Sequence, residues 1–263
     1  MSLRELFDEG GVTIGGWCAI PNAFSTELMG RCGWDWVCVD MQHGLIGYEQ
    51  AAAMLQALAI TGTPSWVRVP WNQPDSIMKM LDAGAQGIIV PMVGTADDAR
   101  RAVEAMKYPP LGSRSWGPIR ASLDVEGYSP TVANTRTVLA AMIETVEGVK
   151  NMDAIMSVEG VDAIYVGPSD LGLTHGMAPT LAPEPGSPHE RLILDVLAAC
   201  QANGVVPGVH TDGIETALRR REAGFRMITV GSDAVLMRKA ASEALSAMRG
   251  AVPAKSGSAS GYV

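Results

Sequence analysis

Short apolar runs alternate with helical patterns along nearly the whole chain. Eight runs rich in β-branched or aromatic residues are predicted to be strands: residues 12–20, 36–40, 65–70, 87–91, 138–144, 162–167, 205–210 and 225–231. Between them, apolar residues recur at helical spacing, and several of these segments end in glycine, as helices often do. Eight strand-then-helix units in 263 residues predict an α/β fold of the (β/α)₈, or TIM, barrel type.

An open, doubly wound sheet is the main alternative to a barrel. The sequence argues against it because no glycine-rich phosphate loop follows the first strand, where residues 18–25 read CAIPNAFS. Residues 109–130 are predicted to be a long irregular loop, and such loops are often functional. The last residues, 251–263, are small and polar, and we predict that they are disordered or an expression remnant. We therefore expect one barrel domain at residues 1–250.

Composition and charge narrow the class of protein. With 47% hydrophobic and 18% charged residues, the chain resembles an ordinary soluble globular protein. Its net charge of −8 argues against a nucleic-acid partner, which usually requires a basic face. The N-terminus does not resemble a signal peptide, and no apolar run approaches the roughly 18 residues of a membrane span. The four cysteines form no CxxC pair, which fits buried, reduced thiols in a cytoplasmic protein.

Polar and charged residues stand at the ends of several predicted strands. In chain order they are Asp40, Gln42, His43, Arg68, Glu144, Ser169, Asp170 and His210. In a (β/α)₈ barrel these ends meet at the face that carries the active site. Each residue alone has an ordinary structural explanation, such as a helix cap or a paired core side chain. Acids, an arginine and histidines together on one rim are less easily explained in that way, and they indicate a functional site.

The lysines argue against one class of carbonyl chemistry. The chain has five, and none stands at the end of a predicted strand: Lys79, Lys107, Lys150, Lys239 and Lys255. A Schiff-base enzyme needs a lysine amine inside its pocket, so carbonyl chemistry here would need a metal instead. Glu144 and Asp170 come from adjacent strands and are hard oxygen ligands that suit Mg²⁺ or Mn²⁺.

Two further segments carry candidate binding residues. In GPSDL, Gly167 lets the backbone approach a ligand and Pro168 suits a first helical turn, whose N–H groups could hold a substrate carboxylate. An ordinary strand–helix turn fits the same residues about as well. In the long loop, Arg114 and Arg120 are candidates for contact with an anion or with a neighbouring subunit. A solvated basic face is the alternative explanation for these two arginines.

The chain carries five motifs in order: VDMQHG, RVPWNQPDSIMKMLDAGAQGIIVP, GSRSWGPIRA, MIET and YVGPSDL. Together they resemble the HpcH/HpaI aldolase family, the metal-dependent pyruvate aldolases, across roughly residues 10–248. The resemblance implies a (β/α)₈ barrel that forms a homohexamer, a trimer of dimers, with exchanged C-terminal helices. It also implies reversible cleavage of 4-hydroxy-2-oxo acids to an aldehyde and pyruvate, or a related 2-oxo acid such as hydroxypyruvate.

The resemblance further assigns roles to individual residues. It places the ligands of a divalent metal, Mg²⁺, Mn²⁺ or Co²⁺, on Glu144 and Asp170, and the contact with the 2-oxo group on Arg68. It places a proton-transferring pair on His43 and Asp40. These two stand three apart, so they can meet only if the chain turns out of the strand after Asp40. Substrate contacts are expected from Arg68, Gln42, Gly167, Pro168, Ser169 and Asp170.

Two positions depart from the family pattern. Many relatives have Glu where this chain has Gln42, and Gln where it has Met142. Both changes alter the polar lining of the expected site, so they bear on the choice of donor and aldehyde. Two other functions stay open. One is an acyl-CoA lyase of the citrate lyase β-subunit or malyl-CoA type, which would be expected to need a more basic surface. The other is a non-catalytic protein that binds a metal and a 2-oxo acid.

Overall fold

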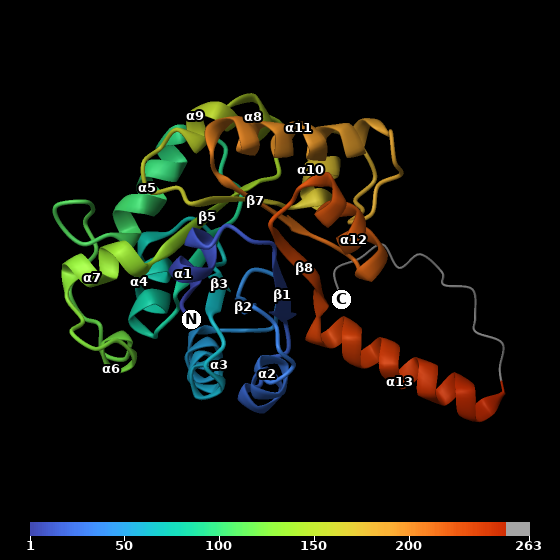
Figure 1. Ribbon diagram of the computed structural model, residues 1–263, viewed down its shortest axis with the longest axis horizontal. Coiled ribbons are helices and arrows are strands. Elements are labelled where there is room, and N and C mark those ends of the chain that lie inside the picture. The colour runs from blue at the N-terminus through green and yellow to red at the C-terminus, as the bar shows by residue number, and fades with distance from the viewer. Residues whose placement is uncertain (251–263) are drawn as a thin grey trace.

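The computed structural model describes residues 1–250, which fold around a closed barrel of eight parallel strands (Figure 1). The strands are β1 (Thr13–Cys18), β2 (Trp36–Asp40), β3 (Ser65–Arg68), β4 (Gly87–Val90), β5 (Val138–Ile143), β6 (Ala163–Val166), β7 (Val206–His210) and β8 (Met227–Ser232). Each strand pairs with the next, and β8 pairs with β1 to close the ring. The predicted (β/α)₈ barrel is confirmed and the open sheet is wrong. The predicted disordered tail, 251–263, lies outside the described residues.

Helices surround the barrel and cover its outer face (Figure 1). They are α1 (Leu3–Asp8), α2 (Ala23–Gly30), α3 (Tyr48–Thr61), α4 (Pro74–Asp82), α5 (Ala96–Met106), α6 (Ala121–Asp124), α7 (Pro130–Arg136), α8 (Val146–Lys150), α9 (Met152–Met156), α10 (Pro168–Thr174), α11 (Pro188–Asn203), α12 (Ile214–Ala223) and α13 (Asp233–Arg249). The segment predicted to be irregular, 109–130, contains the short helix α6. Among residues 1–250, no helix combines the length and apolar character needed to cross a bilayer.

Local sequence sets the ends of several helices. Asn22, Thr95 and Ser187 precede α2, α5 and α11, and each side chain accepts a hydrogen bond from a backbone N–H of the first turn. Gly62 and Gly204 end α3 and α11 with φ angles of 71° and 69°, which glycine adopts without the cost that a Cβ would add. These capping residues explain why the alternation of strands and helices could be predicted from the sequence.

Large side chains on alternate strand residues fill the inside of the barrel. The buried inner cluster includes Trp17, Trp36, Cys38, Trp66, Ile89, Met142, Tyr165 and Met227. Leu3 and Phe7 of α1 join it, and the Phe7 ring lies 5.7 Å from that of Trp66. Small residues make room for the rings: a Cβ on Gly15 would lie 2.2 Å from the Trp36 ring. The barrel is therefore a packed core rather than a pore.

The intervening strand residues point outward and pack against the helices. On β2, Val37 and Val39 are fully buried in the outer cluster, while Trp36 and Cys38 belong to the inner one. Every residue of β2 is buried, because helices cover one face and the barrel interior the other.

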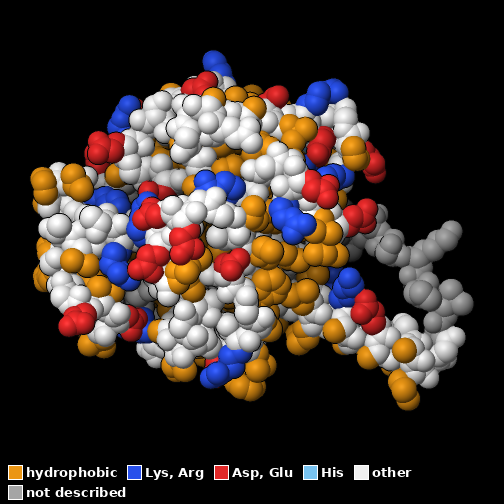
Figure 2. Space-filling model, in the orientation of Figure 1, with side chains coloured by type: hydrophobic (Ala, Val, Ile, Leu, Met, Phe, Trp, Pro, Cys, Tyr) orange, Lys and Arg blue, Asp and Glu red, His pale blue; other side chains and the backbone are white. Residues whose placement is uncertain are grey.

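The last described helix, α13, extends away from the barrel (Figure 1). Asp233 at its start is its buried residue, whereas Met237, Leu245 and Met248 are 62%, 50% and 86% exposed. Figure 2 shows apolar side chains along this projecting helix. An amphipathic helix normally buries its apolar face, so the exposure of these side chains bears on how the chain assembles.

Candidate active site

The predicted polar residues gather at the carboxyl ends of the strands. Asp40 and His210 are the last residues of β2 and β7, Arg68 ends β3, and Glu144 directly follows β5. All four side chains are buried. Buried charged and polar groups at the catalytic face of a barrel mark a functional site more strongly than exposed ones do.

Asp40 and Arg68 form a buried ion pair at the ends of β2 and β3. Arg68 Nε donates to Asp40 Oδ1 at 2.8 Å, and Nη2 donates to Oδ2 at 2.6 Å. Trp17 Nε1 donates to the same Oδ2 at 3.1 Å, and the guanidinium lies 5.0 Å from the centre of the Trp17 ring. Burial alone would raise the pKa of Asp40, but the charge and hydrogen bonds of Arg68 hold it below its ordinary value.

The chain turns sharply after Asp40, as the sequence required. The backbone N–H groups of Gln42 and His43 donate to Asp40 Oδ1 at 3.1 and 3.3 Å, which holds the turn. A Cβ on Gly44 would lie 2.2 Å from the Asp40 carbonyl oxygen, so this close approach requires glycine. Burial, followed by the positive charge of Arg68, lowers the pKa of His43, which favours the neutral imidazole. That Asp40 also fixes the imidazole tautomer remains a prediction.

Glu144 presents one buried oxygen that has no hydrogen-bond partner. Its Oε1 accepts a hydrogen bond of 2.8 Å from the backbone of Met92, whereas Oε2 is buried and unpartnered. Burial, together with the negative charge of Asp170, raises the pKa of Glu144 to about 7, although the Met92 hydrogen bond opposes this shift. Met92 has a φ of 57°, a left-handed conformation that costs energy for a residue with a Cβ. This strained residue was missed in the sequence, where nothing distinguishes it from other loop residues.

Asp170 lies in the first turn of α10, beside Glu144. Gly167 occupies the N-cap position and Pro168 the first helical position, so Asp170 is not the cap of its helix. The charge of Asp170 acts on both Glu144 and His43. A Cβ on Gly167 would lie 2.2 Å from Glu144 Oε2, so glycine is needed where the helix begins.

Glu144 and Asp170 fit a divalent cation. An unpartnered carboxylate oxygen next to a second carboxylate is electrostatically unfavourable, and a cation between them removes the repulsion. Carboxylate oxygens are the ligands that Mg²⁺ and Mn²⁺ prefer. The part of the chain that the structure describes has no group of three or more His, Cys, Asp or Glu residues arranged to hold a metal. The predicted ligand set is this pair of carboxylates.

Both positions that depart from the family pattern border the site. Gln42 Oε1 is a second buried oxygen without a hydrogen-bond partner. Met142 is fully buried, and its Cε lies 2.9 Å from the place that a Cβ on Gly167 would occupy. The thioether therefore contributes an apolar surface close to Glu144, where an amide would offer hydrogen bonds.

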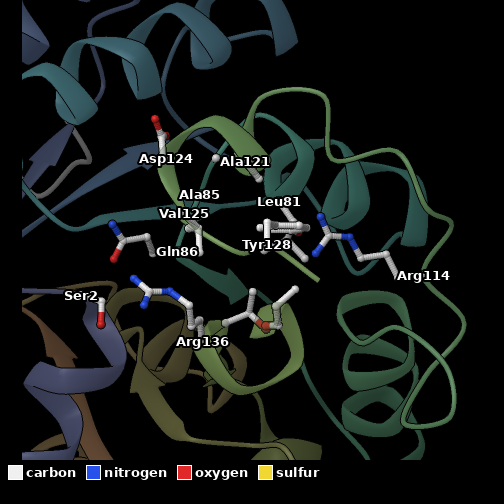
Figure 3. Close-up of a pocket in the computed structure, with 13 residues that line it drawn as sticks. Ser2, Leu81, Ala85, Gln86, Arg114, Ala121, Asp124, Val125, Tyr128 and Arg136 are labelled. Atoms are coloured by element: carbon white, nitrogen blue, oxygen red, sulfur yellow. The ribbon is translucent and has the colours of Figure 1, made fainter. Parts of the chain in front are cut away.

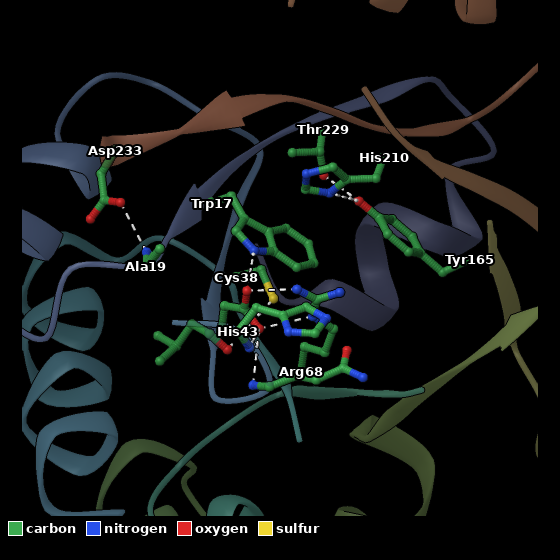
Figure 4. A network of polar contacts seen from close by, with 12 residues as sticks. Trp17, Ala19, Cys38, His43, Arg68, Tyr165, His210, Thr229 and Asp233 are labelled. Carbon is green, nitrogen blue, oxygen red and sulfur yellow. Dashed lines mark hydrogen bonds and ion pairs between the residues drawn. The ribbon is translucent and has the colours of Figure 1, made fainter. Parts of the chain in front are cut away.

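His210 belongs to a buried network inside the barrel (Figure 4). Its Nδ1 lies 3.2 Å from the hydroxyl of Tyr165, which also bonds Thr229 Oγ1. The Trp17 and His210 ring centres are 4.8 Å apart. Burial lowers the pKa of His210 to about 3, with Arg68 as a second cause. The sequence indicated His210 but not Trp17 or Tyr165, because strands buried on both faces show no alternation of apolar and polar residues that would mark the inward positions.

Arg114 and Arg120 attach the long loop to α4. Arg114 is buried, donates to Asp82 at 2.6 Å and lies 4.5 Å from the centre of the Tyr108 ring. Arg120 donates to the carbonyl of Ala83 at 2.9 Å. The solvated basic face considered for these residues is wrong, because both side chains make specific contacts within the chain.

A cavity next to Arg114 lies at the opposite end of the barrel from the rim (Figure 3). Ser2, Gln86 and Thr137 line it, and the last two directly precede β4 and β5. Active sites of these barrels lie at the carboxyl ends of the strands, so this cavity is separate from the candidate site.

The chain is similar to one protein family and to several known proteins over most of its length. Residues 13–240 match the family HpcH/HpaI aldolase/citrate lyase. The chain is 37% identical to a hydroxypyruvate/pyruvate aldolase of Rhizorhabdus wittichii, over 94% of this chain and 98% of the relative. It is 35% identical to a 4-hydroxy-2-oxo-heptane-1,7-dioate aldolase of Escherichia coli, over 95% of each. A crystal structure of a family protein from Burkholderia cenocepacia has a TM-score of 0.87 and 30% identity, covering 94% of this chain and 98% of the other.

Proposed function

Because the chain belongs to the HpcH/HpaI aldolase/citrate lyase family, we propose that it is a divalent-metal-dependent aldolase. It reversibly cleaves 4-hydroxy-2-oxo acids to an aldehyde and a 2-oxo acid, either pyruvate or hydroxypyruvate. The aldolases among its relatives support this reaction. The observation that carries the proposal is the buried, unpartnered Oε2 of Glu144, which lies beside the charge of Asp170 at the catalytic face of the barrel.

The demanding step in this reaction is the formation of a carbanion next to a ketone. A bound divalent ion supplies Lewis-acid stabilisation of the negative charge that develops on the 2-oxo oxygen. Glu144 and Asp170 would hold that ion, and Arg68 would orient the 2-oxo group. A lone unit charge at about 4 Å contributes ~4 kcal/mol at an effective dielectric near 20. Arg68 contributes less than this, because Asp40 balances its charge.

His43 is the proposed proton carrier. In cleavage it takes the proton from the 4-hydroxyl group, and in aldol addition it returns a proton to the new hydroxyl. The lowered pKa of its imidazole supports this role, because a neutral ring is able to accept a proton. Asp40 accepts a hydrogen bond from the backbone N–H of His43 and so fixes the position of the backbone that carries the imidazole.

Substrate contacts are proposed for the turn at the start of α10 and for Gln42. Gly167, Pro168 and Ser169 bring backbone close to Glu144, where the donor carboxylate would bind. The unpartnered Gln42 Oε1 suits a hydroxyl group of the substrate, since an amide oxygen only accepts hydrogen bonds.

The chain is also proposed to act as a homohexamer, a trimer of dimers, in the cytoplasm. The exposed apolar side chains of α13 support exchange of this helix between subunits. The four cysteines are free and three of them are buried, which suits a reducing compartment.

A substrate screen tests the function directly. Pyruvate and hydroxypyruvate are combined with a panel of aldehydes in the presence of Mg²⁺, Mn²⁺ or Co²⁺, and aldol products are measured. Product formation with at least one pair is expected. Cleavage of an acyl-CoA thioester without aldol activity would identify an acyl-CoA lyase instead. Tight binding of a 2-oxo acid with no turnover of any aldehyde would identify a non-catalytic binding protein.

A further inference from the structure

His189 lies buried against the helix that carries Asp170. It is in the first turn of α11, and its ring Nε2 lies 2.7 Å from the carbonyl oxygen of Pro168. A carbonyl oxygen only accepts hydrogen bonds, so Nε2 carries the proton and donates it. Pro168 is the first residue of α10 and precedes Asp170 by two positions. The imidazole therefore holds the backbone of the turn from which the carboxylate projects.

Gly172 admits the imidazole to this position. A Cβ on Gly172 would lie 2.5 Å from Cε1 of His189 and 3.0 Å from each ring nitrogen. Distances this short require the ring to move. Because His189 is 4% exposed, it has little free space into which to move. The helix α10 thus has a glycine at the point where the histidine ring packs against it.

Glu144 fixes the same helix from another side. Thr174, the last residue of α10, donates through Oγ1 to the carbonyl oxygen of Glu144 at 3.2 Å. At the other end of the helix, Glu144 Oε2 occupies the space that a Cβ on Gly167 would fill. The last residue of the helix therefore bonds Glu144, its N-cap lies close to the Glu144 carboxylate, and its first turn is held by His189.

We propose that His189 is a positioning residue for the pair of carboxylates. Its hydrogen bond to Pro168 fixes the first turn of α10, and this sets the position of Asp170 relative to Glu144. The inference rests on the proposed function, in which these two carboxylates hold the metal. Residues that orient metal ligands from behind typically change metal affinity when they are replaced.

The test measures Mn²⁺ affinity, with free Mn²⁺ followed by its electron paramagnetic resonance signal. The variants are His189→Leu, which removes the donor, His189→Gln, which offers an amide N–H in its place, and Gly172→Ala, which displaces the ring. His175→Leu is the matched control, since His175 is the C-cap residue of the same helix and its Nδ1 bonds the carbonyl of Leu171 at 2.8 Å. Urea unfolding of each metal-free variant is measured in parallel.

His189→Leu and Gly172→Ala are expected to weaken Mn²⁺ binding about 10- to 100-fold. His189→Gln should restore much of the affinity, and His175→Leu should bind Mn²⁺ like the wild type. A purely structural role would lower the urea midpoint and leave Mn²⁺ affinity unchanged, and that result would overturn the inference. If His189→Leu does not fold, Gly172→Ala is compared with His189→Gln instead. Weaker Mn²⁺ binding by Gly172→Ala than by His189→Gln supports the inference, and wild-type affinity in both overturns it.

Glu144→Gln separates this inference from the proposed function. If the wild type binds Mn²⁺ and Glu144→Gln does not, the metal site is established and the His189 variants judge the positioning role alone. If the wild type binds no Mn²⁺, or Glu144→Gln binds it unchanged, the proposed metal site is wrong and the role of His189 falls with it.

Discussion

Asp40 and Arg68 are direct register partners on the neighbouring strands β2 and β3, and their side chains meet inside the barrel. The two parallel hydrogen bonds between them use the fork geometry of the guanidinium, which a lysine lacks. Both side chains are at most 3% exposed. The register of β2 and β3 thus places this ion pair in the site, and Asp40 in turn holds the turn that leads to His43.

Breaking this pair is expected to destabilise the protein strongly. Asp40→Asn leaves the Arg68 charge buried without its counter-ion, which typically costs about 3–5 kcal/mol. Urea unfolding measures the loss. Glu27→Gln is the control, because its ion pair with Arg31 lies on the surface and such pairs contribute at most about 1 kcal/mol. Equal effects of the two substitutions would contradict the importance given to the buried pair.

His43→Ala is expected to slow aldol turnover by roughly 10²- to 10⁴-fold, the usual contribution of a general acid–base group. The fold and the Mn²⁺ affinity should stay unchanged, because His43 is not a proposed metal ligand. Steady-state kinetics and metal titration measure the two properties separately. Release of the metal would make His43 a ligand, and near-normal turnover with every competent substrate would assign the proton transfer to another group.

Metal removal is expected to abolish activity, and Mg²⁺, Mn²⁺ or Co²⁺ to restore it. Glu144→Gln should have the same effect as the chelator, because it removes the charge of the proposed ligand. Glu147→Gln, which changes an exposed acid on the following helix, should remain active. Borohydride should trap no adduct. Full activity in excess EDTA, or a reduced lysine adduct detected by mass spectrometry, would exclude the metal mechanism.

His210 is expected to make stability depend on pH. Its folded pKa of about 3 lies below the ordinary value of 6.5, so only the unfolded chain binds this proton between those values. The contribution of His210 to the free energy of unfolding is therefore fully present above pH 6.5 and is lost as pH falls toward 3. The loss amounts to about 2 kcal/mol at pH 5. Urea unfolding from pH 7.5 to pH 5 measures the slope, and His210→Leu should flatten it. An unchanged slope in the variant would show that His210 is not responsible.

The chain is expected to be a hexamer at micromolar concentration, measured by light scattering. The double substitution Leu245→Glu and Met248→Glu places charges on the exposed apolar side of α13 and should shift the hexamer toward smaller species. A monomeric wild type would reject the assembly. A variant that stays fully hexameric would show that this side of α13 is not an interface.

The strands were predictable because apolar runs and turn residues agree along this chain. The second predicted strand, 36–40, matches β2 in both bounds. The third was predicted to reach 70 but ends at Arg68, and Pro70 has no N–H to extend the ladder. What the pattern could not show is which strand residues point inward. Both faces are buried, so apolar residues do not alternate with polar ones, and Tyr165 gave no sign of its role beside His210.

The residues at the strand ends could be predicted, because their place in the site follows from the order of the strands. Contacts between distant segments of the chain could not be predicted. Asp40, Arg68 and Glu144 follow from the rule that strand ends share one face. The hydrogen bond from His189 to Pro168 joins residues 21 apart, and no local signal connects them. The burial of Arg114 likewise results from packing against residues of another segment.

The packing of α1 against the inner cluster of the barrel has a consequence for synthesis of the chain. The backbone N–H of Leu3 donates to the Gln86 side chain and Arg4 pairs with Asp162, and these partners come 83 and 158 residues later in the chain. Phe7 also accepts a contact from Arg226, which is 219 residues away. The helix α1 therefore cannot make these contacts until almost all of the barrel strands have been synthesised, and until then its apolar residues lack their final partners. The N-terminus is among the last parts of the barrel to reach its final position.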